Sequence, residues 1–400
     1  LFRSVDIGHV DEEEFPLDEA RKLITSLAGL MTIAIRQIRI LDGQGRKIER
    51  GTLVIEGERI VAVGPDQTIR LPRGAQRIDG RGMTVLPGLI DCHVHFCLGA
   101  EADVVAAVEQ ESSPVTLLKA AELARRTVQA GFTTVRDVGF RDHAVFALKR
   151  AIESRLTPGP RILAAGLAIC MPRGHARFIG REAQGIEAVR AAVQDQLTAG
   201  AEVIKVIASG GVLTPGTSPD EAQMTVEELR AAVEVATAHG RHVAAHAHGA
   251  TGMKNALRAG VHSIEHATLM DEEAAGLMTQ RGVYMVPTLS ALATTAACPT
   301  GCGIPDSARS KAKNMVRQHE KSFRAAVRRG VPIALETDAA NQQHYEVPAA
   351  FFERVRARPS VQKARTAAFF SGPNAAAQLT GDLDAEIPAF VQRVRDFLGD

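Results

Sequence analysis

The chain has 400 residues, a net charge of +1 and 45% apolar residues, enough for one large domain with an appendage. Acidic and basic residues are interspersed, and there are no tryptophans and only two tyrosines, so we expect no nucleic-acid partner. The longest uncharged apolar stretch, residues 23–35, is shorter than the roughly 20 residues of a bilayer-spanning helix, so we expect no membrane partner.

The cysteines are few, scattered and odd in number, namely Cys92, Cys97, Cys170, Cys298 and Cys302. The N-terminus is acidic and lacks the apolar segment of a signal peptide. Together these features predict a reduced, cytoplasmic protein. Cys298 and Cys302 have a CxxxC spacing, but no second pair completes a zinc site, so we interpret the spacing as chance.

The first part of the chain divides at Met31. Residues 1–30 are interpreted as an N-terminal extension without an assigned role. Residues 31–86 contain the runs TIAIRQIRI, TLVIEGERIVAVG and MTVLPG, which are separated by Gly, Asp and charged turns. Such short alternating runs predict a small domain built on an antiparallel β-sheet.

Residues 87–381 alternate between strand and helix patterns. The predicted strands are 88–95, 132–138, 161–169, 202–209, 242–248, 262–267, 283–289 and 331–338. Helices are predicted between most of them, for example at 114–131 and 225–240. This pattern predicts an α/β fold, a (β/α)8 TIM barrel with a small N-terminal β-sheet domain. A doubly wound sheet would be expected to show a Gly-rich loop after its first strand, and none is present.

Polar residues gather at the carboxyl ends of the predicted strands, where TIM-barrel active sites lie. These residues are His93, His95, Lys205, His246, His248, His266 and Asp338. His93 and His95 are two apart on one strand, so their side chains point to the same side. Each residue alone has an ordinary structural explanation, but their convergence on one rim predicts a metal site.

Lys205 is the most informative of these residues, because it lies among β-branched residues in VIKVIASGG. A buried ammonium is costly unless it is paired or neutralised. A neutral lysine amine can react with CO2 to form a carbamate, which is an anionic ligand able to bridge two metal ions. The alternative for Lys205 is a buried ion pair.

Five motifs, PGLIDCHVH, VIKVIASGG, VAAHAHG, SIEHAT and LETDA, occur in this order. Together they resemble the metal-dependent amidohydrolase superfamily over roughly residues 31–340. The resemblance is to the imidazolonepropionase-related branch, which includes barrel-type Xaa-Pro dipeptidases (prolidases) and the ochratoxin-hydrolysing amidase. Residues 382–400 depart from the family pattern, since they are Arg-rich and helical where family members have strands.

The resemblance implies two divalent metal ions, for which imidazole and carboxylate ligands favour zinc. It implies that His93, His95 and Asp338 hold one ion, and that His246 and His266 hold the other. Carbamylated Lys205 would bridge them. His248 would contact substrate or support the ligands.

The implied activity is hydrolysis of an amide C–N bond in a dipeptide or N-acyl amino acid by a metal-bridging hydroxide, with Asp338 moving the proton. Two alternatives stay open. One is a cyclic-amide hydrolase, like imidazolonepropionase, or a lactonase on the same site. The other is an inactive, metal-poor barrel that serves as a binding protein. The partner is then a small-molecule substrate, and a homo-oligomer is consistent with the family.

Two predicted loops could contact substrate. Residues 171–180, MPRGHARFIG, carry Arg173, His175 and Arg177, which could hold a substrate carboxylate. A solvated basic loop explains them equally well. Residues 210–223 are rich in Gly, Pro and Thr and could form a flap over the site.

Overall fold

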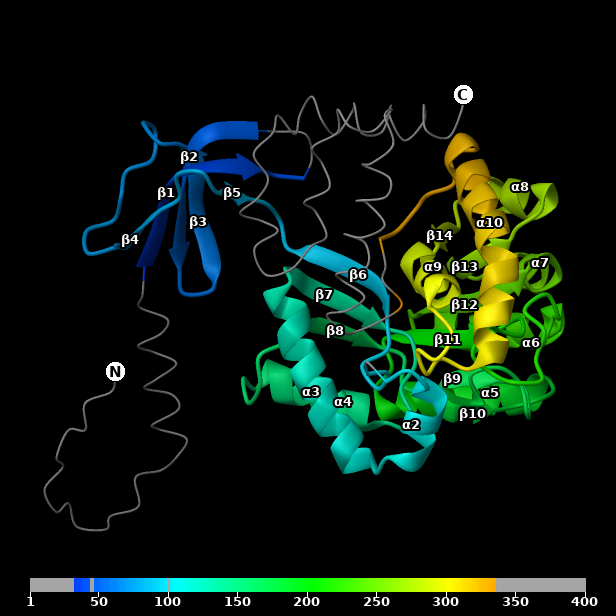
Figure 1. Cartoon of the computed structure of the whole chain (residues 1–400). Helices are drawn as coiled ribbons and strands as arrows, with labels where there is room; N and C mark the ends of the chain where they lie inside the picture. Colours follow the sequence, from blue (N-terminus) through cyan, green and yellow to red (C-terminus); the bar gives the residue numbers. More distant parts are fainter. Residues whose placement is uncertain (1–31, 44–46, 100, 336–337, 339–400) are drawn as a thin grey trace, which may run out of the picture. The chain divides into compact units, whose positions relative to one another are not determined.

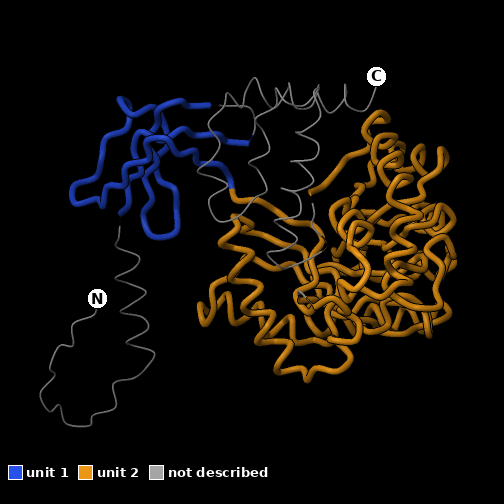
Figure 2. The backbone as a smooth tube through the Cα atoms, in the orientation of Figure 1, with its two compact units in different colours: residues 1–87 blue, residues 88–400 orange. Residues whose placement is uncertain are grey.

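The computed structural model describes residues 32–43, 47–99, 101–335 and 338, and the chain divides into two compact units, residues 1–87 and 88–400 (Figure 2). The predicted N-terminal extension (1–30) and helical tail (382–400) lie outside the described residues. None of the helices within the described ranges is long and apolar enough to cross a membrane.

The first unit is a five-stranded sheet. Its strands are β1 (Thr32–Leu41), β2 (Lys47–Glu56), β3 (Arg59–Pro65), β4 (Gln76–Asp79) and β5 (Thr84–Val85). β1, β2 and β3 pair in antiparallel fashion, and Gly57, with φ +58°, lies in the turn between β2 and β3. β4 and β5 pair parallel to β1. The expected antiparallel sheet is therefore mixed, because the chain crosses to the other side of β1 after β3.

The second unit contains parallel strands with helices outside them (Figure 1). The strands are β6 (Leu89–Val94), β7 (Phe132–Asp137), β8 (Arg161–Ala164), β9 (Ala168–Cys170), β10 (Gly180–Glu182), β11 (Val203–Ile207), β12 (His242–Gly249), β13 (Ser263–Leu269) and β14 (Tyr284–Val286). They form one sheet in the order β6-β7-β8 and a second in the order β10-β9-β11-β12-β13-β14. Most side chains of β11 to β13 are buried, as expected for parallel strands covered on both faces.

The segment after Val331 closes the barrel between β14 and β6, although it is not a regular strand. On one side, Met285 donates its N–H to Pro332 O (2.8 Å). On the other side, Cys92 N donates to Leu335 O (2.9 Å) and Asp338 N donates to His93 O (2.8 Å). The predicted eighth strand thus occupies the expected place, and it carries Asp338 to the carboxyl end of β6.

The predicted third strand, 161–169, is interrupted, because β8 and β9 are separated at Gly166, whose φ is +73°. The carbonyl of Gly166 accepts from Phe140 N (2.8 Å), so this turn is tied to the segment that follows β7. The break lets the chain leave the β6–β8 sheet and enter the second sheet as β9.

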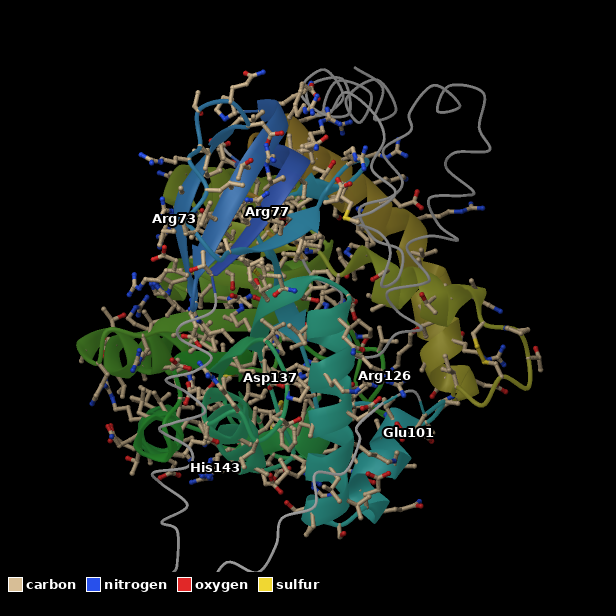
Figure 3. The ribbon with its side chains drawn as sticks, turned by 90° about the vertical axis from the view of Figure 1, so that its left-hand side faces the viewer. Arg73, Arg77, Glu101, Arg126, Asp137 and His143 are labelled. Atoms are coloured by element: carbon tan, nitrogen blue, oxygen red, sulfur yellow. A yellow bond between two sulfur atoms is a disulfide. The ribbon has the colours of Figure 1, made fainter. Side chains whose placement is uncertain are left out.

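The helices are α2 (Val104–Gln110), α3 (Ser113–Gln129), α4 (Ala144–Glu153), α5 (Ile186–Ala199), α6 (Val226–Ala238), α7 (Ala250–Ala259), α8 (Glu272–Arg281), α9 (Leu289–Ala297) and α10 (Asp306–Arg328). α3, which carries Arg126 (Figure 3), contacts β7, and α6 contacts β11 and β12. At the start of α6, Thr225 and Glu228 form a reciprocal capping box, the signal that predicted this helix. The predicted (β/α)8 TIM barrel with a small N-terminal β-sheet domain is confirmed.

Candidate active site

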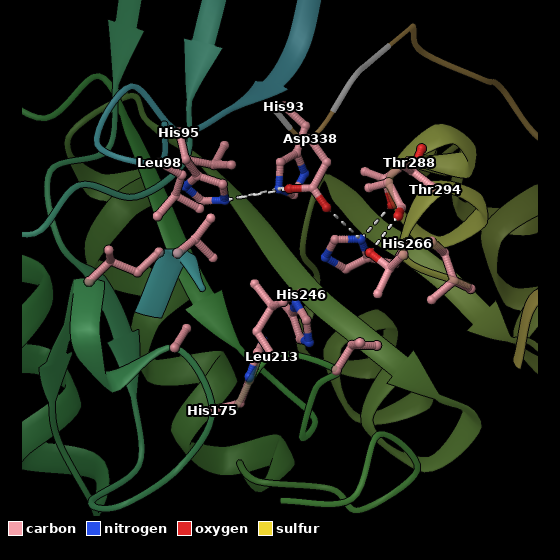
Figure 4. Close-up of a pocket in the computed structure, with 18 of the residues that line it drawn as sticks. His93, His95, Leu98, His175, Leu213, His246, His266, Thr288, Thr294 and Asp338 are labelled. Carbon is pink, nitrogen blue, oxygen red and sulfur yellow. Dashed lines mark hydrogen bonds and ion pairs between the residues drawn. The ribbon is translucent and has the colours of Figure 1, made fainter. Parts of the chain in front are cut away.

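A cavity of about 690 Å³ lies at the carboxyl ends of the barrel strands (Figure 4). Its polar lining consists mainly of the side chains that the sequence marked, His93, His95, His175, Lys205, His246, His248, His266 and Asp338. They come from β6, β11, β12, β13, the loop after β9 and the closing segment. The barrel thus brings together residues up to 245 positions apart, from His93 to Asp338.

His93, His95 and Asp338 form the first potential ligand group. Nδ1 of His95 donates to the carbonyl of Gly139 (2.8 Å), which leaves a lone pair on its Nε2 when the ring is neutral. That Nε2 lies 3.3 Å from Nε2 of His93, which in turn lies 3.2 Å from Oδ1 of Asp338. Electron-rich atoms this close to one another need a cation between them, either a proton or a metal ion. The donor set fits a divalent metal ion such as zinc.

A second group is formed by His246, His248 and His266, each of which offers a nitrogen within 4.8 Å of the others. Nε2 of His246 donates to Gly210 O (3.2 Å), which leaves its Nδ1 free as a ligand. Burial, reinforced by neighbouring positive groups, holds the pKa of all three imidazoles well below its ordinary value. They are therefore neutral near pH 7 and keep the lone pairs that a metal ion needs.

Asp338 lies between the two groups (Figure 4). Its Oδ1 faces His93, whereas its Oδ2 lies 3.8 Å from Nδ1 of His266. Burial raises the pKa of Asp338, but the neighbouring His93, His95 and Lys205 outweigh it and lower the pKa to about 2. An ionised carboxylate at this point can serve both groups.

Lys205 enters the cavity from the centre of β11, where every residue is buried. Its side-chain nitrogen is buried and has no hydrogen-bond partner among the described residues. Burial lowers the pKa of Lys205 to about 8, so the neutral amine is accessible near physiological pH. The alternative explanation, a hydrogen-bonded buried ion pair, does not agree with this unpartnered nitrogen.

The loop after β9 is only partly as predicted. His175 is buried in the cavity, where its Nδ1 lies 2.9 Å from Thr214 Oγ1 and its ring centroid lies 4.5 Å from that of His246. Arg173 and Arg177 are exposed and do not line the cavity. Positive φ angles at Arg173 and Ala176, both 61°, turn the chain on either side of His175. The hypothesis that these arginines hold a substrate carboxylate is therefore not supported.

The outer part of the cavity is mostly apolar. Its lining includes Leu98, Ala102, Val104, Phe178, Val212, Leu213, Ala291, Leu292 and Ile304. Cys298 and Cys302 also line it and form a disulfide, which corrects the interpretation of their spacing as chance and of all five cysteines as reduced. The loop between α9 and α10 brings the two sulfurs together. Cys97 and Cys170 are free thiols.

Sequence reasoning missed two charged residues beneath the histidines, Arg136 and Glu265. Glu265 is fully buried on β13 and contacts both Arg136 and His93. A signal was present, since SIEHAT places a glutamate inside an otherwise buried strand, and a buried carboxylate requires partners. The partners are distant in the sequence and only the fold identifies them.

The fold and the site define a TIM-barrel enzyme with potential metal ligands at the carboxyl ends of its strands. Residues 84–372 match the family model described as "Amidohydrolase family", and the chain belongs to this family. The predicted resemblance to its prolidase and ochratoxinase branch is confirmed. The protein is accordingly a hydrolase of carbon–nitrogen bonds.

Three relatives illustrate the similarity. Ochratoxinase from Aspergillus niger is 31% identical over 334 residues, which cover 75% of this chain and 68% of that protein. The structure of a Xaa-Pro dipeptidase with methionine bound in its active site is 33% identical, with a TM-score of 0.72 over 91% of this chain and 89% of the other. The structure of a prolidase complexed with N-methylphosphonate-L-proline is 31% identical, with a TM-score of 0.73 over 91% of this chain and 88% of the other.

Proposed function

We propose that this protein is a metal-dependent amidohydrolase that cleaves the amide bond of a dipeptide or an N-acyl amino acid. One observation carries the proposal. Two groups of potential metal ligands lie in one cavity, with Asp338 close to both His93 and His266, and the unpartnered nitrogen of Lys205 lies in the same cavity. Such a concentration of ligands has no role in stabilising a barrel, because each polar group buried there costs free energy unless it is satisfied.

In the proposed site, His93, His95 and Asp338 would hold one divalent ion, and His246 and His266 would hold a second. Zinc suits this combination of imidazole and carboxylate ligands. Lys205, as a carbamate formed from the neutral amine and CO2 with release of a proton, would supply further oxygen ligands to the two ions. Conversion of the amine to a carbamate also removes a cation that would otherwise repel the metal ions.

The chemistry then follows from the positions of the protein groups. Bound metal ions lower the pKa of water and polarise the scissile carbonyl. Asp338, an ionised carboxylate between the two ligand groups, accepts the proton of the attacking water and returns it to the leaving amine. His248 and His175 border the same cavity, where they can donate to polar atoms of the substrate.

The substrate class is supported by the relatives and by the cavity wall. The names of the relatives include a Xaa-Pro dipeptidase and an ochratoxinase. The apolar lining contributed by α9 and by the segments near Leu98 and Val212 favours a substrate with a large apolar group beside the scissile bond. The 690 Å³ volume is in the range of small-molecule sites.

The first experiment is the metal content of the purified protein, expressed with bicarbonate, as wild type and as Lys205→Ala. We expect about two metal ions per chain in the wild type and a sharp fall in the variant. Lys149→Ala is the matched control, because Lys149 donates to Ile162 O (3.0 Å) and pairs with Glu202 away from the cavity. It should retain wild-type metal content.

Metal-loaded protein should then hydrolyse members of a panel of Xaa-Pro dipeptides and N-acyl amino acids. Absence of metal from the wild type after growth with zinc and bicarbonate would contradict the proposal. Equal metal content in Lys205→Ala and wild type would refute the carbamate bridge while leaving the histidine ligands in place.

A further inference from the structure

Glu265 is a fully buried carboxylate below the cavity that the proposed hydrolysis does not use. Its Oε1 lies 2.5 Å from Ser263 Oγ and 2.8 Å from Nη2 of Arg136. Its Oε2 lies 2.8 Å from Nδ1 of His93 and 3.0 Å from the same Arg136 nitrogen. Both carboxylate oxygens are therefore fully engaged by surrounding donors.

These contacts determine where the protons are. Arg136 can only donate, so the carboxylate of Glu265 is ionised and accepts from it. An ionised carboxylate must accept the proton on Nδ1 of His93. Neutral His93 therefore keeps its lone pair on Nε2, the nitrogen that faces His95 and Asp338.

Arg136 fixes Glu265 in turn, because its side chain is held by contacts to two other strands. It lies on β7, its Nε donates to Cys92 O on β6 (2.7 Å), and its Nη1 lies 3.1 Å from Ser263 Oγ on β13. The side chain thus spans the barrel interior and holds the carboxylate in one orientation. A rotation of Glu265 would break the ion pair in a buried environment.

We infer that Glu265 is a positioning residue that sets the orientation and tautomer of His93, so that Nε2 of His93 faces the metal site, and that Arg136 holds Glu265 for this purpose. The inference rests on the proposed function, in which His93 is a metal ligand. The physical reason is general, since a carboxylate that accepts from the distal nitrogen of a ligating imidazole fixes the ring and raises its basicity.

The decisive variant is Glu265→Gln, because a glutamine side chain has nearly the same shape as glutamate but carries an NH2 group in place of one carboxylate oxygen. The guanidinium of Arg136 can accept no hydrogen bond, so the amide oxygen of the glutamine must face Arg136 and its NH2 group must face His93. An NH2 donor at Nδ1 favours the opposite tautomer, with the proton on Nε2, where metal should bind. We expect zinc affinity to fall about 10–100-fold, measured on the purified chain by competition with a chromophoric chelator.

A double variant separates positioning from stability. In Arg136→Met/Glu265→Gln the amide can turn its oxygen to His93, and no guanidinium is left uncompensated. We expect this protein to bind zinc more tightly than Glu265→Gln, with most of the lost affinity restored. Glu202→Gln, which changes a carboxylate paired with Lys149 outside the cavity, should bind zinc like the wild type.

The outcomes are distinct. Wild-type zinc affinity in Glu265→Gln would overturn the inference while leaving the proposed function intact. So would a double variant that binds no more tightly than Glu265→Gln, because loss of the ion pair would then explain the defect. A wild-type protein that binds no zinc would overturn both the inference and the proposed function.

Discussion

Glu265 inside the barrel and Glu122 on α3 are held by arginines at almost the same distances, but in opposite surroundings. Glu265 lies 2.8 and 3.0 Å from Nη2 of Arg136 and is fully buried. Glu122 lies 2.7 Å from both Nε and Nη2 of Arg125 and 2.8 Å from Nε of Arg126 on the outside of α3, where its side chain is 42% exposed. Judged by distance alone, the two ion pairs would be equally strong.

Burial decides how much each of these two ion pairs contributes to stability. Water and dissolved ions compete for the Glu122 cluster, and holding its long side chains in place costs entropy. Around Glu265 no water replaces a lost partner, so removal of one charge leaves the other buried and uncompensated. We therefore expect ion pairs of almost the same length to be dispensable on the helix and essential in the barrel.

The largest effect is expected for Glu265→Leu, which leaves Arg136 without its carboxylate. We expect a loss of about 3–5 kcal/mol in the free energy of unfolding, measured by urea denaturation in excess chelator so that metal binding does not contribute. Arg136→Met/Glu265→Leu should recover most of this loss. A single variant as stable as the wild type would show that burial does not distinguish the two sites.

An intermediate effect on the free energy of unfolding is expected in the small β-domain, where the side chain of Asp66 is 8% exposed. Asp66 accepts from Thr52 Oγ1 (2.5 Å) and from the N–H of Gln37 (3.2 Å), and Thr52 is fully buried. Asp66→Ala would leave both donors without this acceptor, at a cost of about 1–3 kcal/mol by the same urea assay.

Asp66→Asn is the control for that prediction, since both donors bind Oδ1 of Asp66 and the amide oxygen of an asparagine can accept from both of them. It should lose less stability than Asp66→Ala. If the two variants were equally unstable, the negative charge rather than the hydrogen bonds of Asp66 would be the stabilising feature.

The smallest effect is expected for Glu122→Gln. The two arginines lose an exposed partner that water replaces, so the melting temperature should be indistinguishable from that of the wild type at physiological salt. Repeating the melt at low ionic strength sharpens the comparison, because an exposed pair gains strength there. A clear destabilisation at physiological salt would mean that this cluster acts as a network.

Much of the site was predictable because its chemistry is local in the sequence. A histidine or lysine inside an apolar strand pattern is unusual wherever it occurs, and the carboxyl end of a barrel strand is where such residues meet. For this reason His93, Lys205, His246, His266 and Asp338 could be selected before their distances were known.

The errors and omissions share another cause. Arg173 and Arg177 were considered as substrate contacts, with a solvated basic loop as the equal alternative, and the structure leaves both exposed while His175 lies in the cavity. The disulfide between Cys298 and Cys302 depends on how the loop between α9 and α10 folds. Side-chain direction in a loop is not a property of residue type.

The sequence by itself determined the strand and helix order, the barrel and the polar residues at its carboxyl ends, because hydrophobic periodicity and strand polarity are encoded along the chain. Only the tertiary structure decided how these residues are paired. Glu265 lies 172 positions from His93 and 129 from Arg136, and their contacts exist only because the closed barrel brings β6, β7 and β13 around one interior. In that interior, desolvation makes each charge depend on partners that no local pattern could reveal.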